Sequence, residues 1–168
     1  MGVLTTWRVP CATVGEEYTC RMKLTIARVE NTSVFQIGGK VGWENSRVLD
    51  SEVRDAIKSG ARFLVFDLDA VQFLSSGAIG VLVYHLRKLQ DVVGDIFVVT
   101  SNTYVLYLFR TIGFHRVFEG KIFSSIDGVG DCLRGRGEAW RNPEPTAWSE
   151  VEGFDGEDDE RSLLEEGG

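Results

Sequence analysis

Two adjacent serines at the start of an apolar segment are the residues best placed for chemistry in this chain. Ser75 and Ser76 precede Gly77 and a run with apolar residues at helical spacing that continues to Leu89. A serine at a helix start caps free backbone N–H groups, an interaction worth about 0.5–2 kcal/mol. Its hydroxyl is also well presented for phosphorylation, which would add about −1.5 to −2 charge at the positive end of the helix dipole. The sequence therefore predicts a helix cap, a phosphate acceptor, or both.

An acidic pair offers a second kind of chemistry. Asp67 and Asp69 fall at and just past the end of a buried run that begins at Phe63. The ends of parallel strands are where α/β proteins often place catalytic, metal-binding or phosphate-accepting carboxylates. A phosphate-accepting aspartate would need further carboxylates at the end of the first strand, and residues 24–29 supply none. A solvated strand end is the favoured interpretation of this pair.

The remaining polar residues predict neither a metal site nor a cofactor site. His85 is assigned to the polar face of the helix that follows the serines, and His115 follows a helix stop, so both are expected at the surface. Gly38-Gly39-Lys40 lacks the spacing of a phosphate-binding loop. The cysteines are too few and too scattered for a zinc site or a disulfide scaffold, which favours a reducing cytoplasm. They are Cys11, Cys20 and Cys132.

Strands and helices alternate along most of the chain and position these residues. Two β-rich runs around residues 30–32 predict an opening hairpin, with Gly38-Gly39 ending its second strand. Asn45 and Asn102 are the expected caps of two further helices, and Gly113 is the expected stop of the second. Further strands are expected at residues 63–68, 96–99 and around 117–123, and a weak last helix at 125–133. This order predicts a mixed α/β sheet: a hairpin, then strands paired in parallel through helical crossovers.

Charge divides the chain into parts. Residues 142–168 hold ten acidic residues and one basic residue, so the net charge of −7 comes from this segment, and a basic nucleic-acid surface is not expected. The expected organisation is an irregular leader at 1–21, a domain at 22–133 and an acidic, disordered tail at 134–168. Met22 is a second candidate for the true start. The tail either solubilises the protein or docks, on a partner or on the domain's basic helix face near Arg87 and Lys88. No uncharged apolar run approaches the 18 residues of a membrane span.

With this order of elements in place, residues 22–133 resemble the STAS domain family, in particular the bacterial anti-sigma factor antagonists. The resemblance rests on the strand Leu64-Val65-Phe66-Asp67-Leu68, on Ser75-Ser76-Gly77-Ala78-Ile79-Gly80 and on the strand Gly94-Asp95-Ile96-Phe97-Val98-Val99. In that family the loop usually reads Asp-Ser-Ser/Thr-Gly, and a partner anti-sigma factor, a serine kinase, phosphorylates the hydroxyl residue after the aspartate. The resemblance thus implies Ser75 as acceptor, with Ser76 as second choice, and Leu74 replaces the aspartate.

The resemblance implies a non-enzymatic regulatory protein that binds an anti-sigma factor kinase and so frees a sigma factor. Two alternatives stay open: a STAS scaffold or sensor that is never phosphorylated, which Leu74 favours, and a small-molecule or nucleotide-binding α/β domain. Whether the domain forms a homodimer also stays open. The expected partner-binding residues lie in the loop and along the following helix: Phe73, Leu74, Gly77, Tyr84, His85 and Lys88.

Overall fold

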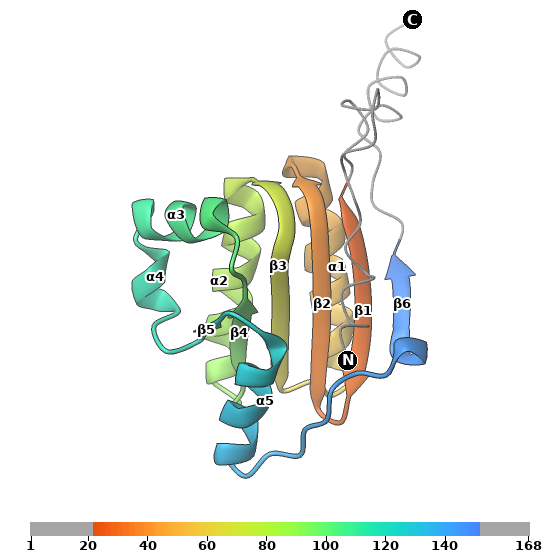
Figure 1. The fold of residues 1–168 in the computed structure, drawn as a ribbon. Coiled ribbons are helices and arrows are strands. Elements are labelled where there is room, and N and C mark those ends of the chain that lie inside the picture. The colour runs from red at the N-terminus through yellow and green to blue at the C-terminus, as the bar shows by residue number, and fades with distance from the viewer. Residues whose placement is uncertain (1–21, 152–168) are drawn as a thin grey trace, which may run out of the picture.

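A six-stranded mixed sheet with helices on both faces forms the domain, and a computed structural model describes residues 22–151 of it (Figure 1). The strand order is β5-β4-β3-β2-β1-β6. β1 pairs antiparallel with β2 and with β6, whereas β2, β3, β4 and β5 pair in parallel. This confirms the predicted hairpin and the parallel remainder of the sheet. The expected leader at 1–21 and the last seventeen residues lie outside the described residues.

The elements follow the predicted order as far as α5, except that a short helix, α4, lies where the sequence predicted the start of a strand at Val117. The strands are β1 (Lys23–Val29), β2 (Thr32–Val41), β3 (Phe63–Leu74), β4 (Asp95–Val99), β5 (Ile122–Phe123) and β6 (Trp148–Val151). The helices are α1 (Trp43–Lys58), α2 (Ser76–Gln90), α3 (Thr103–Thr111), α4 (Phe114–Val117) and α5 (Ile126–Gly135), with a 3-10 turn at Pro145–Ala147. Within these described residues no helix has both the length and the apolar character that crossing a membrane requires.

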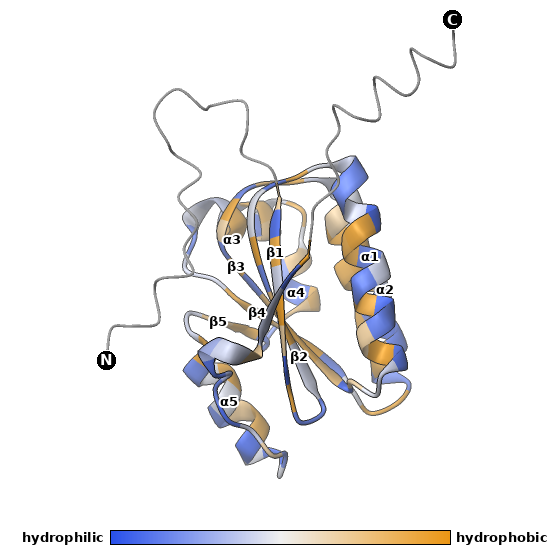
Figure 2. Cartoon of the chain, turned by 90° about the vertical axis from the view of Figure 1, so that its right-hand side faces the viewer, coloured by the Kyte–Doolittle hydropathy of each residue, from blue (hydrophilic) through white to orange (hydrophobic). Residues whose placement is uncertain are grey.

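Two hydrophobic cores lie on opposite faces of the sheet because successive side chains of a strand point to opposite faces. Leu64 and Phe66 of β3 face α1, α2 and α3, and the Phe66 ring stacks on Phe35 of β2 with 5.0 Å between ring centroids. Phe63 and Val65 face α5 instead. Figure 2 shows α1 and α2 side by side on one face of the sheet and α5 on the other.

Three element boundaries differ from the sequence prediction. β2 continues past Gly38-Gly39 to Val41, because two register shifts against β3, together with the left-handed Gly39 (φ 79°), let the strand bulge rather than end. α1 begins at Trp43 after Gly42, and Asn45 is a buried residue of its first turn, not its cap. β3 runs on to Leu74, so Asp67 and Asp69 lie within a strand and not beyond its end.

The largest correction concerns the predicted tail. Residues 134–151 belong to the fold: β6 completes the sheet by pairing Trp148 with Ala27 and Val151 with Leu24. The Trp140 ring is buried in the core beneath α5. The acidic composition of the last twenty-seven residues concealed this short edge strand, which adds little apolar sequence of its own.

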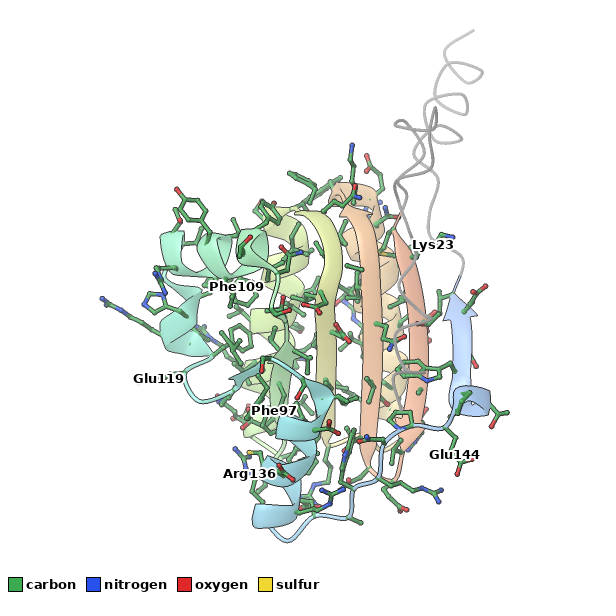
Figure 3. All side chains as sticks on the ribbon, viewed as in Figure 1. Lys23, Phe97, Phe109, Glu119, Arg136 and Glu144 are labelled. Carbon is green, nitrogen blue, oxygen red and sulfur yellow. The ribbon has the colours of Figure 1, made fainter. Side chains whose placement is uncertain are left out.

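The end of α5 is fastened to the sheet by a charged cluster. Arg136 lies with its guanidinium 5.2 Å from the centre of the Phe97 ring, and its Nη1 is 3.1 Å from a carboxylate oxygen of Asp95 (both Phe97 and Arg136 are labelled in Figure 3). Lys121 Nζ lies 2.9 Å from the other oxygen of the same carboxylate. Asp95 is buried, so these two cations compensate a charge that would be costly to leave unpaired.

Candidate functional site

The hydroxyl of Ser75 lies at the N-terminus of α2, as predicted. Ser75 is the N-cap residue with extended backbone (φ −73°, ψ 159°), and its Oγ accepts a hydrogen bond of 3.2 Å from the backbone N–H of Ala78. The cap prediction is therefore confirmed. The backbone N–H of Ser75 donates to the carbonyl of Val41 at 2.9 Å, which anchors the turn to the end of β2. Ser75 is half-buried, and Ser76 in the first helical position is exposed.

Nothing in the first turn of α2 opposes a negative charge. The turn contains no acidic residue. The free N–H groups and the dipole of a helix N-terminus stabilise an anion by about 0.3–1 kcal/mol at an exposed site. A phosphate on Ser75 Oγ would therefore be compatible with the folded domain.

Leu74 is not available for the partner contact that the sequence predicted. Its side chain is only 4% exposed and belongs to the core on the α1–α2 face. Its backbone N–H donates to the Tyr104 hydroxyl at 3.3 Å. Leu74 is the last residue of β3 and packs in the same core as Val71, so its assignment as a partner contact is wrong. The neighbouring Phe73 is 47% exposed and stays available for contact.

A tryptophan that the sequence analysis did not single out lies beside the serines. Trp43, the first residue of α1, is 63% exposed. A Cβ atom placed on Gly77 would lie 3.2 Å from the Trp43 ring and 3.1 Å from Ser46 Oγ, so the absence of a side chain at Gly77 lets the two helix starts approach closely. With Asn45 as the predicted cap, Trp43 would lie in a loop before α1. In the structure α1 begins at Trp43, so the Trp43 ring lies beside the start of α2. We call Trp43, Phe73, Ser75, Ser76 and Gly77 the α2 entrance surface.

The loop behind this surface is held by hydrogen bonds between β3 and the start of α3. Asp69 Oδ1 accepts from the backbone N–H of Ser101 at 2.6 Å and from its hydroxyl at 3.1 Å. Asn102 caps α3, as predicted, by accepting from the N–H of Tyr104 at 3.0 Å. Its Nδ2 also donates to the carbonyls of Asp69 at 3.1 Å and of Val71 at 2.7 Å. The geometry thus gives Asp69 a structural role in holding this loop.

The structure separates the other predicted contact residues from the serines. Tyr84 lies nine residues beyond Ser75 along α2, which is about 13 Å at 1.5 Å rise per residue. Tyr84 is 48% exposed, and Lys88 Nζ lies 4.9 Å from the centre of its ring. These two side chains are accessible, but they belong to a different surface from the α2 entrance surface.

His85 is not the surface histidine that the helix pattern suggested. It is only 2% exposed, and its Nε2 lies 2.7 Å from Oδ1 of Asp50 on α1. The pattern treated one side of α2 as solvent, whereas α1 covers it. His85 therefore connects the two helices, and its prediction as a surface residue and direct partner contact is wrong. His115 is exposed, as predicted.

The described residues build no other site of the kinds considered from the sequence. Gly38-Gly39-Lys40 lies inside β2 and not in a loop before a helix. Among residues 22–151 no three ligating side chains come together as a metal ion would require. Cys132 is a free thiol, and Cys11 and Cys20 lie outside the described residues.

Comparisons with known proteins agree with the fold. The family model described as "STAS domain" matches residues 23–129. A protein of Bordetella bronchiseptica, BtrV, which carries the name of an anti-sigma factor antagonist, is 26% identical over 97 residues, covering 58% of this chain and 84% of its own. An anti-sigma factor antagonist from Mycobacterium paratuberculosis has a similar structure, with a TM-score of 0.61 and 19% identity over 69% of this chain and 97% of that one. The phosphorylated Bacillus cell fate determinant SpoIIAA gives a TM-score of 0.55 and 17% identity over 66% and 99% of the two chains.

Proposed function

Because this chain belongs to the STAS domain family, we propose that it is an anti-sigma factor antagonist: a non-enzymatic, cytoplasmic protein that binds a serine-kinase anti-sigma factor and frees a sigma factor. The relative BtrV and the structural neighbour from Mycobacterium paratuberculosis carry the name of this activity. The observation in this chain that supports it most is the α2 entrance surface, which combines a capping serine with exposed aromatic side chains.

The aromatic residues give this surface the character of a protein-binding site. Trp43 and Phe73 are both large and about half exposed or more. Residues of this kind dominate the binding energy of protein interfaces when a partner buries them. Gly77 contributes indirectly, because its lack of a side chain lets the Trp43 ring pack against the start of α2, beside the serines.

Phosphorylation of Ser75 would switch this surface off while leaving the fold intact. In the free domain the helix N-terminus supports the added charge. Inside a protein interface the same phosphate, with about −1.5 to −2 charge, would lose its bound water, and this desolvation would weaken binding of the partner. The Ala78 N–H donates to Ser75 Oγ and so holds this oxygen in place, although Leu74 stands where the family usually has an aspartate.

One observation supports a second candidate, a STAS scaffold that binds its partner without being phosphorylated. Leu74 is buried where the family usually carries an aspartate, so the residue before Ser75 offers a kinase no carboxylate. The scaffold would use the same entrance surface and would differ only in the chemistry at Ser75.

A reconstituted binding assay tests the proposed function. The full chain is titrated into a complex of a kinase-type anti-sigma factor from the same organism with its sigma factor, and released sigma factor is measured. We expect stoichiometric release by the wild-type chain and at least tenfold weaker release by Trp43→Ala. Failure of the wild-type chain to bind any kinase-type anti-sigma factor of its organism would refute the proposal.

A further inference from the structure

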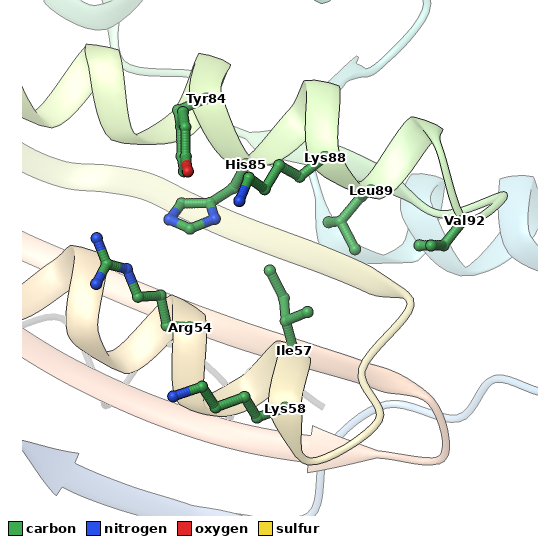
Figure 4. A pocket seen from close by; sticks show the side chains of 8 residues that line it. All are labelled: Arg54, Ile57, Lys58, Tyr84, His85, Lys88, Leu89 and Val92. Atoms are coloured by element: carbon green, nitrogen blue, oxygen red, sulfur yellow. The ribbon is translucent and has the colours of Figure 1, made fainter.

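A groove on the helical face of the domain is separate from the α2 entrance surface. It lies between the C-terminal halves of α1 and α2 and has a volume of about 550 Å³ (Figure 4). Arg54 and Lys58 of α1 lie on one wall, and Tyr84, His85 and Lys88 of α2 lie on the other. A volume of this size is in the range of binding sites for small ligands and short peptide segments.

The charge of the groove is positive. Lys58 on one wall and Lys88 on the other are exposed, and neither has an ion-pair partner within residues 22–151. Arg54 adds a third cation whose Nη2 lies 2.8 Å from Asp50. Two exposed lysines on opposite sides of a groove, without acidic partners, favour an occupant that carries several negative charges.

The floor of the groove is apolar and holds one unsatisfied polar atom. Ile57, Leu89 and Val92 line it, so the occupant should also bring apolar side chains. His85 Nδ1 is buried without a hydrogen-bond partner among the described residues. Because this atom is shielded from solvent, it does not contribute to the contacts that an occupant of the groove would make.

The chain itself contains a segment with these properties. Residues 152–168 carry eight acidic residues and one basic residue, together with Phe154, Leu163 and Leu164. Residues 1–151 carry seventeen acidic and seventeen basic residues, so the whole net charge of −7 lies in this segment. Seventeen residues span up to about 55 Å when extended. That reach is long compared with a radius of gyration of about 14 Å for a domain of this size.

We propose that the groove between α1 and α2 binds residues 152–168 of the same chain, with the carboxylates at Lys58 and Lys88 and the leucines on the apolar floor. The segment leaves the fold at β6, which pairs with β1, and α1 lies behind β1 and β2 in Figure 1. Val151 lies at the end of the sheet where α1 begins, and the groove lies at the opposite end of α1, so the segment has to pass around α1 and along its length, about 24 Å, which is within its reach. This contact does not depend on the proposed function, because it involves neither Ser75 nor an anti-sigma factor.

Amide NMR spectra of the full ¹⁵N-labelled chain test the contact. Lys58→Glu/Lys88→Glu should move the resonances of residues 152–168 to the values of the free synthetic peptide and lower the bound fraction at least tenfold. The matched control, Arg110→Glu/Arg116→Glu on α3 and α4, should leave them unchanged. Raising the salt concentration to 0.5 M should act like the groove variant, because screening weakens exposed charge pairs.

A second variant keeps the test independent of any effect on α1 and α2. Asp158→Asn/Asp159→Asn/Glu160→Gln changes only the segment, and it should shift the amides of Tyr84 and Lys88 while those of β4 stay in place. If the resonances of residues 152–168 are identical in the wild-type chain and in Lys58→Glu/Lys88→Glu, the proposal is wrong. Shifts that vanish on dilution would also overturn it, because they would place the segment in the groove of a second copy.

Discussion

Substitutions at Ser75 separate its role in stability from its role in partner binding. Ser75→Ala removes the acceptor of the Ala78 N–H, a 3.2 Å hydrogen bond at the N-terminus of a helix that contributes six buried residues. Loss of such a cap costs about 1 kcal/mol. With a urea dependence of about 2 kcal/mol per molar, the unfolding midpoint should fall by about 0.5 M. Ser76→Ala is the matched control, because Ser76 is exposed and does not cap the helix, and its midpoint should not move.

Ser75→Asp should have the opposite pattern. Aspartate caps a helix about as well as serine and adds a favourable charge at the N-terminus, so the unfolding midpoint should equal or exceed that of the wild type. In the proposed complex, the carboxylate would lose its water and keep only the helix N–H groups as partners, at a cost of about 2 kcal/mol or more. Affinity for the anti-sigma factor, measured by calorimetry, should therefore fall about thirtyfold or more.

The two substitutions refute the reasoning in different ways. If Ser75→Ala leaves the urea midpoint unchanged, the cap contributes nothing to the stability of α2. If Ser75→Asp binds the anti-sigma factor as tightly as the wild type, Ser75 lies outside the interface. The proposed switch requires a stability loss from Ser75→Ala and an affinity loss from Ser75→Asp.

Three further predictions concern other parts of the domain. Trp43→Ala should weaken anti-sigma factor binding at least tenfold, but it should change the free energy of unfolding by less than about 0.5 kcal/mol because the ring is 63% exposed. Val117→Ala is the control. Wild-type affinity in Trp43→Ala, or the same loss of affinity in Val117→Ala, would contradict the prediction. Gly130→Ala would place a Cβ atom 2.4 Å from Trp140 Nε1. We therefore expect the free energy of unfolding to fall by about 1–3 kcal/mol and the NMR resonance of the Trp140 indole N–H to shift. An unchanged resonance would refute this packing. Asn102→Ala removes the α3 cap and two hydrogen bonds donated to β3, so the free energy of unfolding in urea should fall by about 2–3 kcal/mol. Asn102→Asp keeps the oxygen that caps α3 but not the two donated bonds, so it should recover only the part of the loss that belongs to the cap.

The sequence predicted the parts of the fold that local patterns determine. The strands at β1, β3 and β4, the caps at Ser75 and Asn102 and the stop at Gly113 follow from apolar spacing and from side chains that bond their own backbone. These signals act over a few residues, so no tertiary information was needed. The hairpin and the parallel order followed from the sequence of elements alone.

The errors arose where a distant element decides a residue's environment. His85 appeared exposed because the helical pattern cannot show that α1 covers that side of α2 and brings Asp50 within 2.7 Å. Leu74 appeared to be part of a loop because the extension of β3 depends on its pairing with β2 up to Val41. β6 was missed because four residues at a sheet edge carry almost no pattern of their own.

The candidate site was only partly predictable for the same reason. The serines and Phe73 are contiguous in the sequence, so the loop could be found from the sequence. Trp43 comes to the site from thirty-two residues before Ser75, through the packing of two helix starts at Gly77. A side chain brought in by such packing leaves no mark in the local sequence.

Phosphate mapping tests the central claim most directly. The full chain is incubated with ATP and a kinase-type anti-sigma factor that it binds, and the modified residue is identified by mass spectrometry while complex formation is followed by native mass measurement. We expect one phosphate, on Ser75, and loss of the complex in proportion to its incorporation. A phosphate elsewhere, or a fully phosphorylated Ser75 in an intact complex, would contradict it.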